Sequence, residues 1–192
     1  MSSTSTATHR CPVWMGYFLA SGLRKLLQNP TKIIAPHVQP GMTALDLGCA
    51  MGFFTLPLAR AVGPKGKVIA VDVEPRMLAI LTRRAQQAGL DDRIETHACP
   101  EDGLGLRGRE RSVDFVLAIA VMHELADQDL TLSELAPLVK PGGRLLLAEP
   151  AFHVTQDEFE HTVTIAQQRG FTPADPIRIR LSRTMLMTRG SR

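Results

Sequence analysis

The sequence predicts an α/β protein with a doubly wound, mostly parallel seven-stranded sheet and a terminal antiparallel strand. Two observations favour this class: short apolar runs alternate with amphipathic segments, and glycine or proline separates most of them. Strands that alternate with helices pair in parallel, are covered on both faces and cross over with a right hand. The 192 residues suit one domain, and 44% apolar but only 5% aromatic residues predict an aliphatic core.

The N-terminal part is expected to lie outside the sheet. Residues 1–8 are rich in serine and threonine and predict a disordered tail. Trp14–Leu27 has a strongly apolar face typical of a helix, and Thr31–Val38 predicts a second, shorter helix. No later insertion is long enough to cover the rim of the sheet. We therefore expect residues 1–40 to form a tail and a helical lid, and residues 41–192 to form the cofactor-binding domain.

The predicted strands are apolar or β-branched runs bounded by turn residues. They are Thr43–Leu47, Lys67–Val71, Arg93–Ala98, Val113–Ile119, Arg144–Ala148, Ile177–Leu181 and Thr184–Thr188. The last two flank Ser182-Arg183 and predict an antiparallel pair.

The predicted helices carry start and stop signals. They are Phe53–Val62, Pro75–Ala88, Asp129–Val139 and Thr155–Arg169. Pro75 suits a first helical turn, and Gly89 suits a helix end. Thr155 and Glu158 have the spacing of a capping box, in which each side chain bonds the backbone amide of the other.

The segment Asp46–Gly52 follows the first strand and contains two glycines, Gly48 and Gly52. Glycine lets the backbone turn sharply from strand to helix and approach a ligand closely. Asp72 ends the second strand, where a carboxylate can accept hydrogen bonds from both hydroxyls of a ribose. The two features together predict a cofactor with a nucleoside part.

The details of this loop disfavour a dinucleotide. The dinucleotide fingerprint is G-x-G-x-x-G/A, whereas here the glycines are four residues apart and Ala50 lies between them. Asp46 stands two residues before Gly48, where its carboxylate would repel a pyrophosphate but attract an ammonium or sulfonium group.

Four segments in this order resemble the motif series of class I S-adenosylmethionine-dependent methyltransferases. They are Asp46–Gly52, Val71–Val73, Val113–Leu117 and Leu138–Leu145. The chain is most similar to the small-molecule enzymes of the UbiE-like, methyltransferase type 11 kind, over about residues 41–188. The resemblance implies a Rossmann-like methyltransferase fold, S-adenosylmethionine as cofactor, and transfer of its methyl group to a small-molecule acceptor.

The resemblance also implies roles for single residues. The loop from Gly48 to Gly52 should wrap the methionine part of the cofactor, Asp72 should hold the ribose and Val73 should pack on the adenine. The sequence departs from the family at Ala50, where glycine is usual, and at Cys99, where an acid is common. The full cofactor set is Asp46, Gly48, Cys49, Ala50, Gly52, Asp72, Val73, Cys99, Pro100 and Ala118.

The residues after the fourth and fifth strands should face the acceptor. His123 is the candidate general base, because the pKa of histidine lies near neutrality; the alternative is a hydrogen-bonded structural histidine in a turn. Glu149 and His153 are candidate acceptor-binding residues. Trp14 and Tyr17 would shape the same pocket from the lid, unless they pack on the flank of the sheet.

Composition and charge indicate which classes of partner and which compartment to expect. The net charge of +3 is too small to argue for nucleic acid. Cys11, Cys49 and Cys99 have no pairing motif, which favours a reducing, cytoplasmic compartment and predicts no metal site. No apolar run is long enough to span a bilayer. Oligomeric state has no signal in the sequence. An RNA or protein methyltransferase, a cofactor-binding protein without catalysis and a nicotinamide oxidoreductase remain alternatives.

Overall fold

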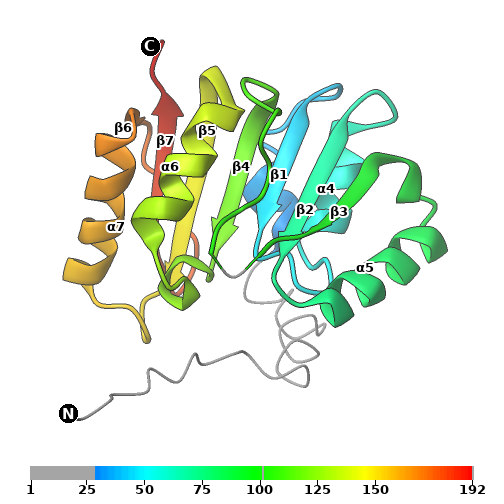
Figure 1. The fold of residues 1–192 in the computed structure, drawn as a ribbon, viewed down its shortest axis with the longest axis horizontal. Helices are drawn as coiled ribbons and strands as arrows, with labels where there is room; N and C mark the ends of the chain where they lie inside the picture. Colours follow the sequence, from blue (N-terminus) through cyan, green and yellow to red (C-terminus); the bar gives the residue numbers. More distant parts are fainter. Residues whose placement is uncertain (1–28, 101, 192) are drawn as a thin grey trace.

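The computed structural model describes residues 29–100 and 102–191. This part of the chain forms a seven-stranded sheet with the order β3-β2-β1-β4-β5-β7-β6 (Figure 1). The strands are β1 (Thr43–Leu47), β2 (Lys67–Asp72), β3 (Ile94–Ala98), β4 (Val113–Ile119), β5 (Val139–Pro150), β6 (Phe171–Pro173) and β7 (Ser182–Arg189). Strands β1 to β5 pair in parallel, and β7 runs antiparallel to both β5 and β6. The predicted fold class is confirmed.

Helices cover both faces of this sheet. They are α3 (Pro30–Ile34), α4 (Thr55–Val62), α5 (Pro75–Gln87), α6 (Gln128–Leu138) and α7 (Gln156–Gln168), with 3-10 turns η1 (Asp91–Arg93) and η2 (Met122–Glu124). The helices α6 and α7 lie on one face, and α3, α4 and α5 lie on the other (Figure 1). The predicted capping box between Thr155 and Glu158 begins α7.

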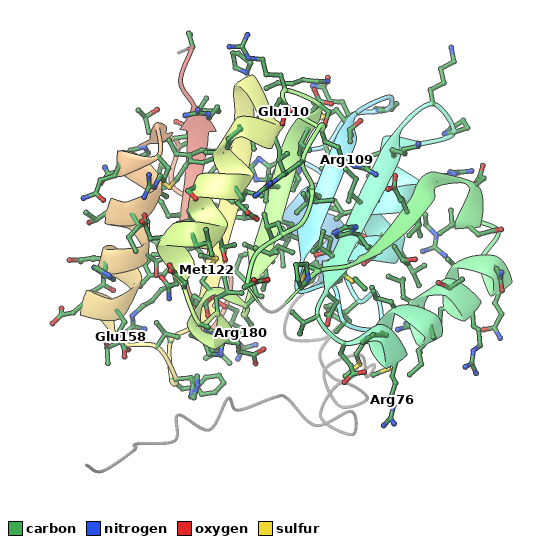
Figure 2. The ribbon with its side chains drawn as sticks, viewed as in Figure 1. Arg76, Arg109, Glu110, Met122, Glu158 and Arg180 are labelled. Atoms are coloured by element: carbon green, nitrogen blue, oxygen red, sulfur yellow. The ribbon has the colours of Figure 1, made fainter. Side chains whose placement is uncertain are left out.

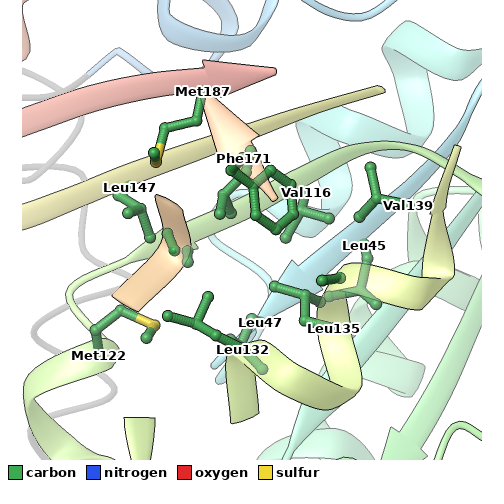
Figure 3. Close-up of a cluster of buried hydrophobic side chains, with 14 of the residues drawn as sticks. Leu45, Leu47, Val116, Met122, Leu132, Leu135, Val139, Leu147, Phe171 and Met187 are labelled. Atoms are coloured by element: carbon green, nitrogen blue, oxygen red, sulfur yellow. The ribbon is translucent and has the colours of Figure 1, made fainter. Parts of the chain in front are cut away.

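The core is aliphatic, as predicted, and is divided by the sheet. Alternate strand residues point to opposite faces, so Leu45 packs toward α6 while Ala44 packs toward α4. Figure 3 shows the larger cluster, in which Leu135 of α6 lies with Phe171 of β6 and Met187 of β7. Full burial of each such side chain contributes roughly 1.5–3 kcal/mol. This packing fixes the strand ends that carry the candidate site.

The predicted strand Ile177–Leu181 is wrong. Residues 174–181 form no strand, and the partner of β7 at the edge of the sheet is β6. The alternating isoleucines follow from packing, because Ile179 is buried against the core and Ile177 packs beside it. Ser182 then donates to the carbonyl of Ile179 at 3.1 Å, which turns the chain into β7. The sequence did not predict β6, which has three residues and ends in proline.

Some boundaries also differ from the prediction. The helix predicted over Thr31–Val38 ends at Ile34. The strand β5 begins at Val139 rather than Arg144, because Val139 pairs with Val113 before a register shift in the ladder. The predicted helix Trp14–Leu27 lies outside the described residues. In the described ranges, no helix is long and apolar enough to cross a membrane.

Candidate active site

The carboxyl ends of the parallel strands meet at one edge of the sheet, which is the lower edge in Figure 1. Figure 2 places Met122 and Arg76 toward this edge, opposite Arg109 and Glu110. Ligands of open α/β sheets bind beyond the carboxyl ends of the strands, at the point where the strand order reverses. Here the order reverses between β1 and β4, so the loops after these strands form the candidate site.

The loop of residues 48–52, here called the glycine loop, turns sharply after β1. The amides of Gly48 and Cys49 both donate to the carbonyl of Val71, at 2.9 and 3.0 Å. Gly48 has a φ of +68° and Gly52 a φ of +84°, in the region that favours glycine. The loop is therefore bonded to β2 and needs glycine at both positions.

Asp72 lies at the end of β2 and holds the glycine loop. Its Oδ2 accepts from the amide of Ala50 at 2.8 Å, and its Oδ1 accepts from the amide of Glu74 at 2.9 Å. Burial raises the pKa of Asp72, while these hydrogen bonds oppose the rise. Ala50 reaches its position with a φ of +45°, which costs a residue other than glycine about 1–2 kcal/mol.

Asp72 and its neighbour fit the nucleoside part of a cofactor. A carboxylate has about four acceptor sites, and two backbone amides leave room for two ribose hydroxyls. Val73 follows directly and is 52% exposed, which presents an apolar surface beside Asp72. Cys99 lies close by, because its amide donates to the carbonyl of Asp72 at 3.1 Å, and Pro100 is exposed after it.

Three of the predicted cofactor residues have buried side chains. Asp46 is buried and accepts from the hydroxyl of Thr55 at 2.6 Å, which ties β1 to the first turn of α4. Cys49 is buried, and burial raises the pKa of its thiol, as do the nearby carboxylates of Asp46 and Asp72. Ala118 is fully buried inside β4. These side chains support the glycine loop and strands from behind.

On the β4 and β5 side, the structure brings His123, Glu149 and His153 together, here called the histidine cluster. Glu149 is only 2% exposed. Its Oε1 accepts from the amides of Val121 and Met122, at 3.2 and 2.8 Å, and its Oε2 contacts Nδ1 of His123. The ring of His153 meets that of His123 edge to face, with centroids 4.8 Å apart.

Carboxylates surround His123 on several sides. The hydrogen bond to Glu149 raises the pKa of His123, burial opposes the rise, and the charges of Glu149, Glu124 and Glu158 add to it. The nearest oxygen of Glu124 lies 3.9 Å from Nε2 of His123, beyond hydrogen-bond distance. Burial raises the pKa of Glu124 as well. The cluster therefore stabilises a protonated imidazole.

The two sides of the site touch through Val121. A Cβ placed on Gly48 would lie 2.5 Å from Cγ2 of Val121, so the glycine loop packs directly against the residue that precedes η2. Glycine at position 48 is thus required by both its backbone angle and this contact. The turn that carries His123 and the loop after β1 form one continuous surface.

Sequence reasoning missed the residues that brace this arrangement. Gln128 donates to the carbonyl of Met122 at 3.0 Å and accepts from the hydroxyl of Thr162 at 2.7 Å, which links η2 to α7. No local pattern marks the bond of Gln128 to Thr162, 34 residues away, or the contact of Val121 with Gly48. Trp14 and Tyr17 lie outside the described residues. Among the described side chains, no group of three or more metal-ligating residues is close enough to hold an ion.

The fold is that of enzymes whose cofactor contains a nucleoside. It has a glycine loop after the first strand, an acidic residue after the second, and a parallel sheet with an antiparallel edge. The chain matches the family model of a methyltransferase domain over residues 38–173 and belongs to that family. S-adenosylmethionine is the cofactor of these enzymes. The predicted family and cofactor are confirmed.

Two curated relatives and one solved structure show the extent of the likeness. The chain is 34% identical over 113 residues to a demethylmenaquinone methyltransferase of Oceanobacillus iheyensis, covering 59% of this chain and 46% of that one. It is 30% identical over 165 residues to an arsenite methyltransferase of Aquipseudomonas alcaligenes, covering 73% and 47%. The chain thus spans about half the length of these relatives.

The fold is shared with a solved S-adenosylmethionine-dependent methyltransferase from Aquifex aeolicus. The TM-score is 0.80 at 23% identity, and the match covers 93% of this chain and 98% of that one. At this identity the likeness establishes the architecture.

Proposed function

We propose that the protein transfers the methyl group of S-adenosylmethionine to a small-molecule acceptor. One observation carries the proposal: the glycine loop and the turn bearing His123 are in contact, through Gly48 and Val121. A cofactor held along the glycine loop would therefore place its reactive end beside the histidine cluster. The relatives named above methylate small acceptors by their names, a demethylmenaquinone and arsenite, which supports the acceptor class.

On the cofactor side, Asp72 would accept the ribose hydroxyls and Val73 would pack on the adenine. The backbone of Gly48, Ala50 and Gly52 would follow the methionine part. Cys99 and Pro100 would border the adenine. Bound in this way, the cofactor supplies a sulfonium methyl group that is already activated for displacement. The protein then has mainly to align the acceptor and exclude water, and alignment alone is worth on the order of 7–11 kcal/mol.

On the acceptor side, His123, Glu149 and His153 would contact the acceptor or position the group that does. The described part of the cluster offers a ring edge from His153, which is exposed, and the partly buried ring of His123. Trp14 and Tyr17 would complete the pocket if residues 1–40 act as a lid over the domain at 41–192.

Calorimetry tests the cofactor first, with S-adenosylmethionine, S-adenosylhomocysteine and NAD(H) titrated separately into the full chain. We expect both adenosyl compounds to bind and NAD(H) not to bind; the reverse result would favour an oxidoreductase. A radiolabelled methyl-transfer assay against a panel of small metabolites then separates an enzyme from a cofactor-binding protein. An RNA gel shift at low salt addresses the remaining alternative, because binding through phosphates is strongest there.

A further inference from the structure

The buried carboxylate of Glu149 faces a turn that offers it three hydrogen-bond donors. Two are the amides of Val121 and Met122, and the third is Nδ1 of His123. The first two donors belong to the backbone, so they fix the carboxylate against η2 whatever rotamers Val121 and Met122 adopt. The imidazole therefore meets an acceptor whose position is set before any substrate arrives.

This contact determines which nitrogen of His123 carries the hydrogen. An ionised carboxylate only accepts hydrogen bonds, so Nδ1 must carry the hydrogen and donate it to Glu149. In the neutral imidazole, Nε2 then has a lone pair and no hydrogen. The only carboxylate described near Nε2 is that of Glu124, at 3.9 Å, which is too far to bond it. His123 is thus oriented with its basic nitrogen turned away from Glu149.

The surroundings of His123 favour the protonated ring that results when Nε2 takes up a proton. Glu149 and Glu124 lie beside it, Glu158 of α7 adds charge from the next element, and His153 meets its ring edge to face. The same carboxylates that raise the pKa of His123 would stabilise an imidazolium formed during reaction. A base of this kind matches a proton donor that ionises not far above neutrality.

We infer that Glu149 is a positioning residue that makes His123 a general base, and that the acceptor therefore carries a weakly acidic O–H, as in a phenol or an enol. The inference rests on the proposed function. The acceptor oxygen forms a bond to the methyl carbon, and the carbon–sulfur bond breaks with its electron pair remaining on sulfur. The acceptor proton passes to Nε2 of His123, and Glu149 stabilises the imidazolium.

Nuclear magnetic resonance of the full chain labelled with 15N-histidine tests the positioning without cofactor. We expect the neutral ring of His123 to carry its hydrogen on Nδ1. Glu149→Gln should lower the pKa of His123 and raise the population with hydrogen on Nε2. Glu124→Gln is the matched control. It removes a carboxylate that lies near the same ring but is too far away to form a hydrogen bond with it, so the tautomer of His123 should stay unchanged. A neutral wild-type ring with hydrogen on Nε2 would overturn the inference, and this measurement needs no variant to fold.

Methyl transfer to a series of substituted phenols of graded acidity tests the acceptor class. Glu149→Gln should lower the transfer rate about 10²-fold or more and move the rising limb of its pH profile to lower pH, with cofactor affinity held within twofold. If calorimetry shows that the cofactor binds but no phenol is methylated, or if tertiary amines are methylated in their place, the acceptor assignment is wrong. Absence of cofactor binding would instead refute the proposed function itself.

Discussion

The glycine loop with Asp72 and the histidine cluster with Glu149 hold a carboxylate in two different ways. Asp72 is half-buried and bonded by backbone amides at both oxygens, so acceptor sites remain for a ligand. Glu149 is almost wholly buried and bonded by two amides and by a side chain that can itself gain or lose a proton. The first arrangement leaves a fixed acceptor open to a ligand, whereas the second couples geometry to protonation.

Gly48→Ala should have the largest effect, because it disturbs the contact that joins the two regions. The φ of +68° would cost alanine about 1–2 kcal/mol, and overlap with Val121 would add about 1–3 kcal/mol to the loss in free energy of unfolding. Urea unfolding measures the change.

Gly89→Ala is the matched control for this substitution. Gly89 has a φ of +62° with nothing within 4 Å of an added Cβ, so only the backbone cost should appear. In a double-mutant cycle, Gly48→Ala should cost less in the Val121→Ala background than in the wild type, because Cγ2 of Val121 is gone while its Cβ, 2.8 Å from the added atom, remains. Equal losses for Gly48→Ala and Gly89→Ala would show that the contact with Val121 does not constrain the loop.

Asp72→Ala should weaken the binding of S-adenosylhomocysteine by about 10–100-fold, since two hydrogen bonds to a charged acceptor are removed. It should also reduce stability by about 1–3 kcal/mol, because the amides of Ala50 and Glu74 lose their acceptor. Calorimetry and urea unfolding measure the two effects.

Asp114→Ala is the control that separates the loss of stability from the loss of cofactor affinity. Asp114 accepts from the amide of Thr43 at 2.8 Å and pairs with Lys140 at 2.7 Å, at the start of β4 and away from the glycine loop. Its removal should lower stability while leaving cofactor affinity within twofold. If both variants lose affinity equally, the cofactor is not held by Asp72.

The contrast between the two regions also explains what could be predicted from the sequence. Most strands, the glycine loop, Asp72 and the Thr155 capping box carry local signals, because periodicity and strand-end position are properties of neighbouring residues; β6, with three residues, is too short to show a period. A glycine-rich turn and an acid at a strand end are enough to predict that these two loops lie together, and the bonds between Asp72 and the glycine loop confirm it.

The histidine cluster carries a weaker signal. His123 and Glu149 were predicted separately, but their pairing joins the turn η2 to the strand β5, and no spacing encodes it. The same reason hides the contact of Val121 with Gly48 and the brace from Gln128. Asp46 also has a long-range role that its charge alone does not reveal, because its carboxylate accepts from the hydroxyl of Thr55 in the interior.

The pH dependence of stability should distinguish the histidine cluster from the glycine loop with Asp72. Glu149 raises the folded pKa of His123 above the ordinary histidine value of 6.5, so the stabilisation is full below 6.5 and is lost as the pH rises through the higher folded value. The stability advantage of the wild type over His123→Gln should therefore shrink between pH 6 and pH 9 by no more than about 1.5–3 kcal/mol, the range for one hydrogen bond to a charged group.

A double-mutant cycle with Glu149→Gln assigns this effect, since Glu124, Glu158 and His153 also face His123. In the Glu149→Gln background, the loss in free energy of unfolding caused by His123→Gln should change far less with pH. An advantage that stays constant across the range would mean that the two side chains do not share a proton-dependent bond.

Ala50→Gly should have the smallest effect and addresses the remaining departure of the glycine loop from its family. Relief of the +45° φ would gain about 1–2 kcal/mol, while the greater freedom of glycine in the unfolded chain would cost about 0.4–1 kcal/mol. The net expectation is stabilisation by up to about 1.6 kcal/mol in urea unfolding. Ala35→Gly is the control, because Ala35 is exposed with a φ of −53° and should only lose stability. If Ala50→Gly destabilises as much as Ala35→Gly, Ala50 carries no strain, and its hydrogen bond to Asp72 is made without backbone cost.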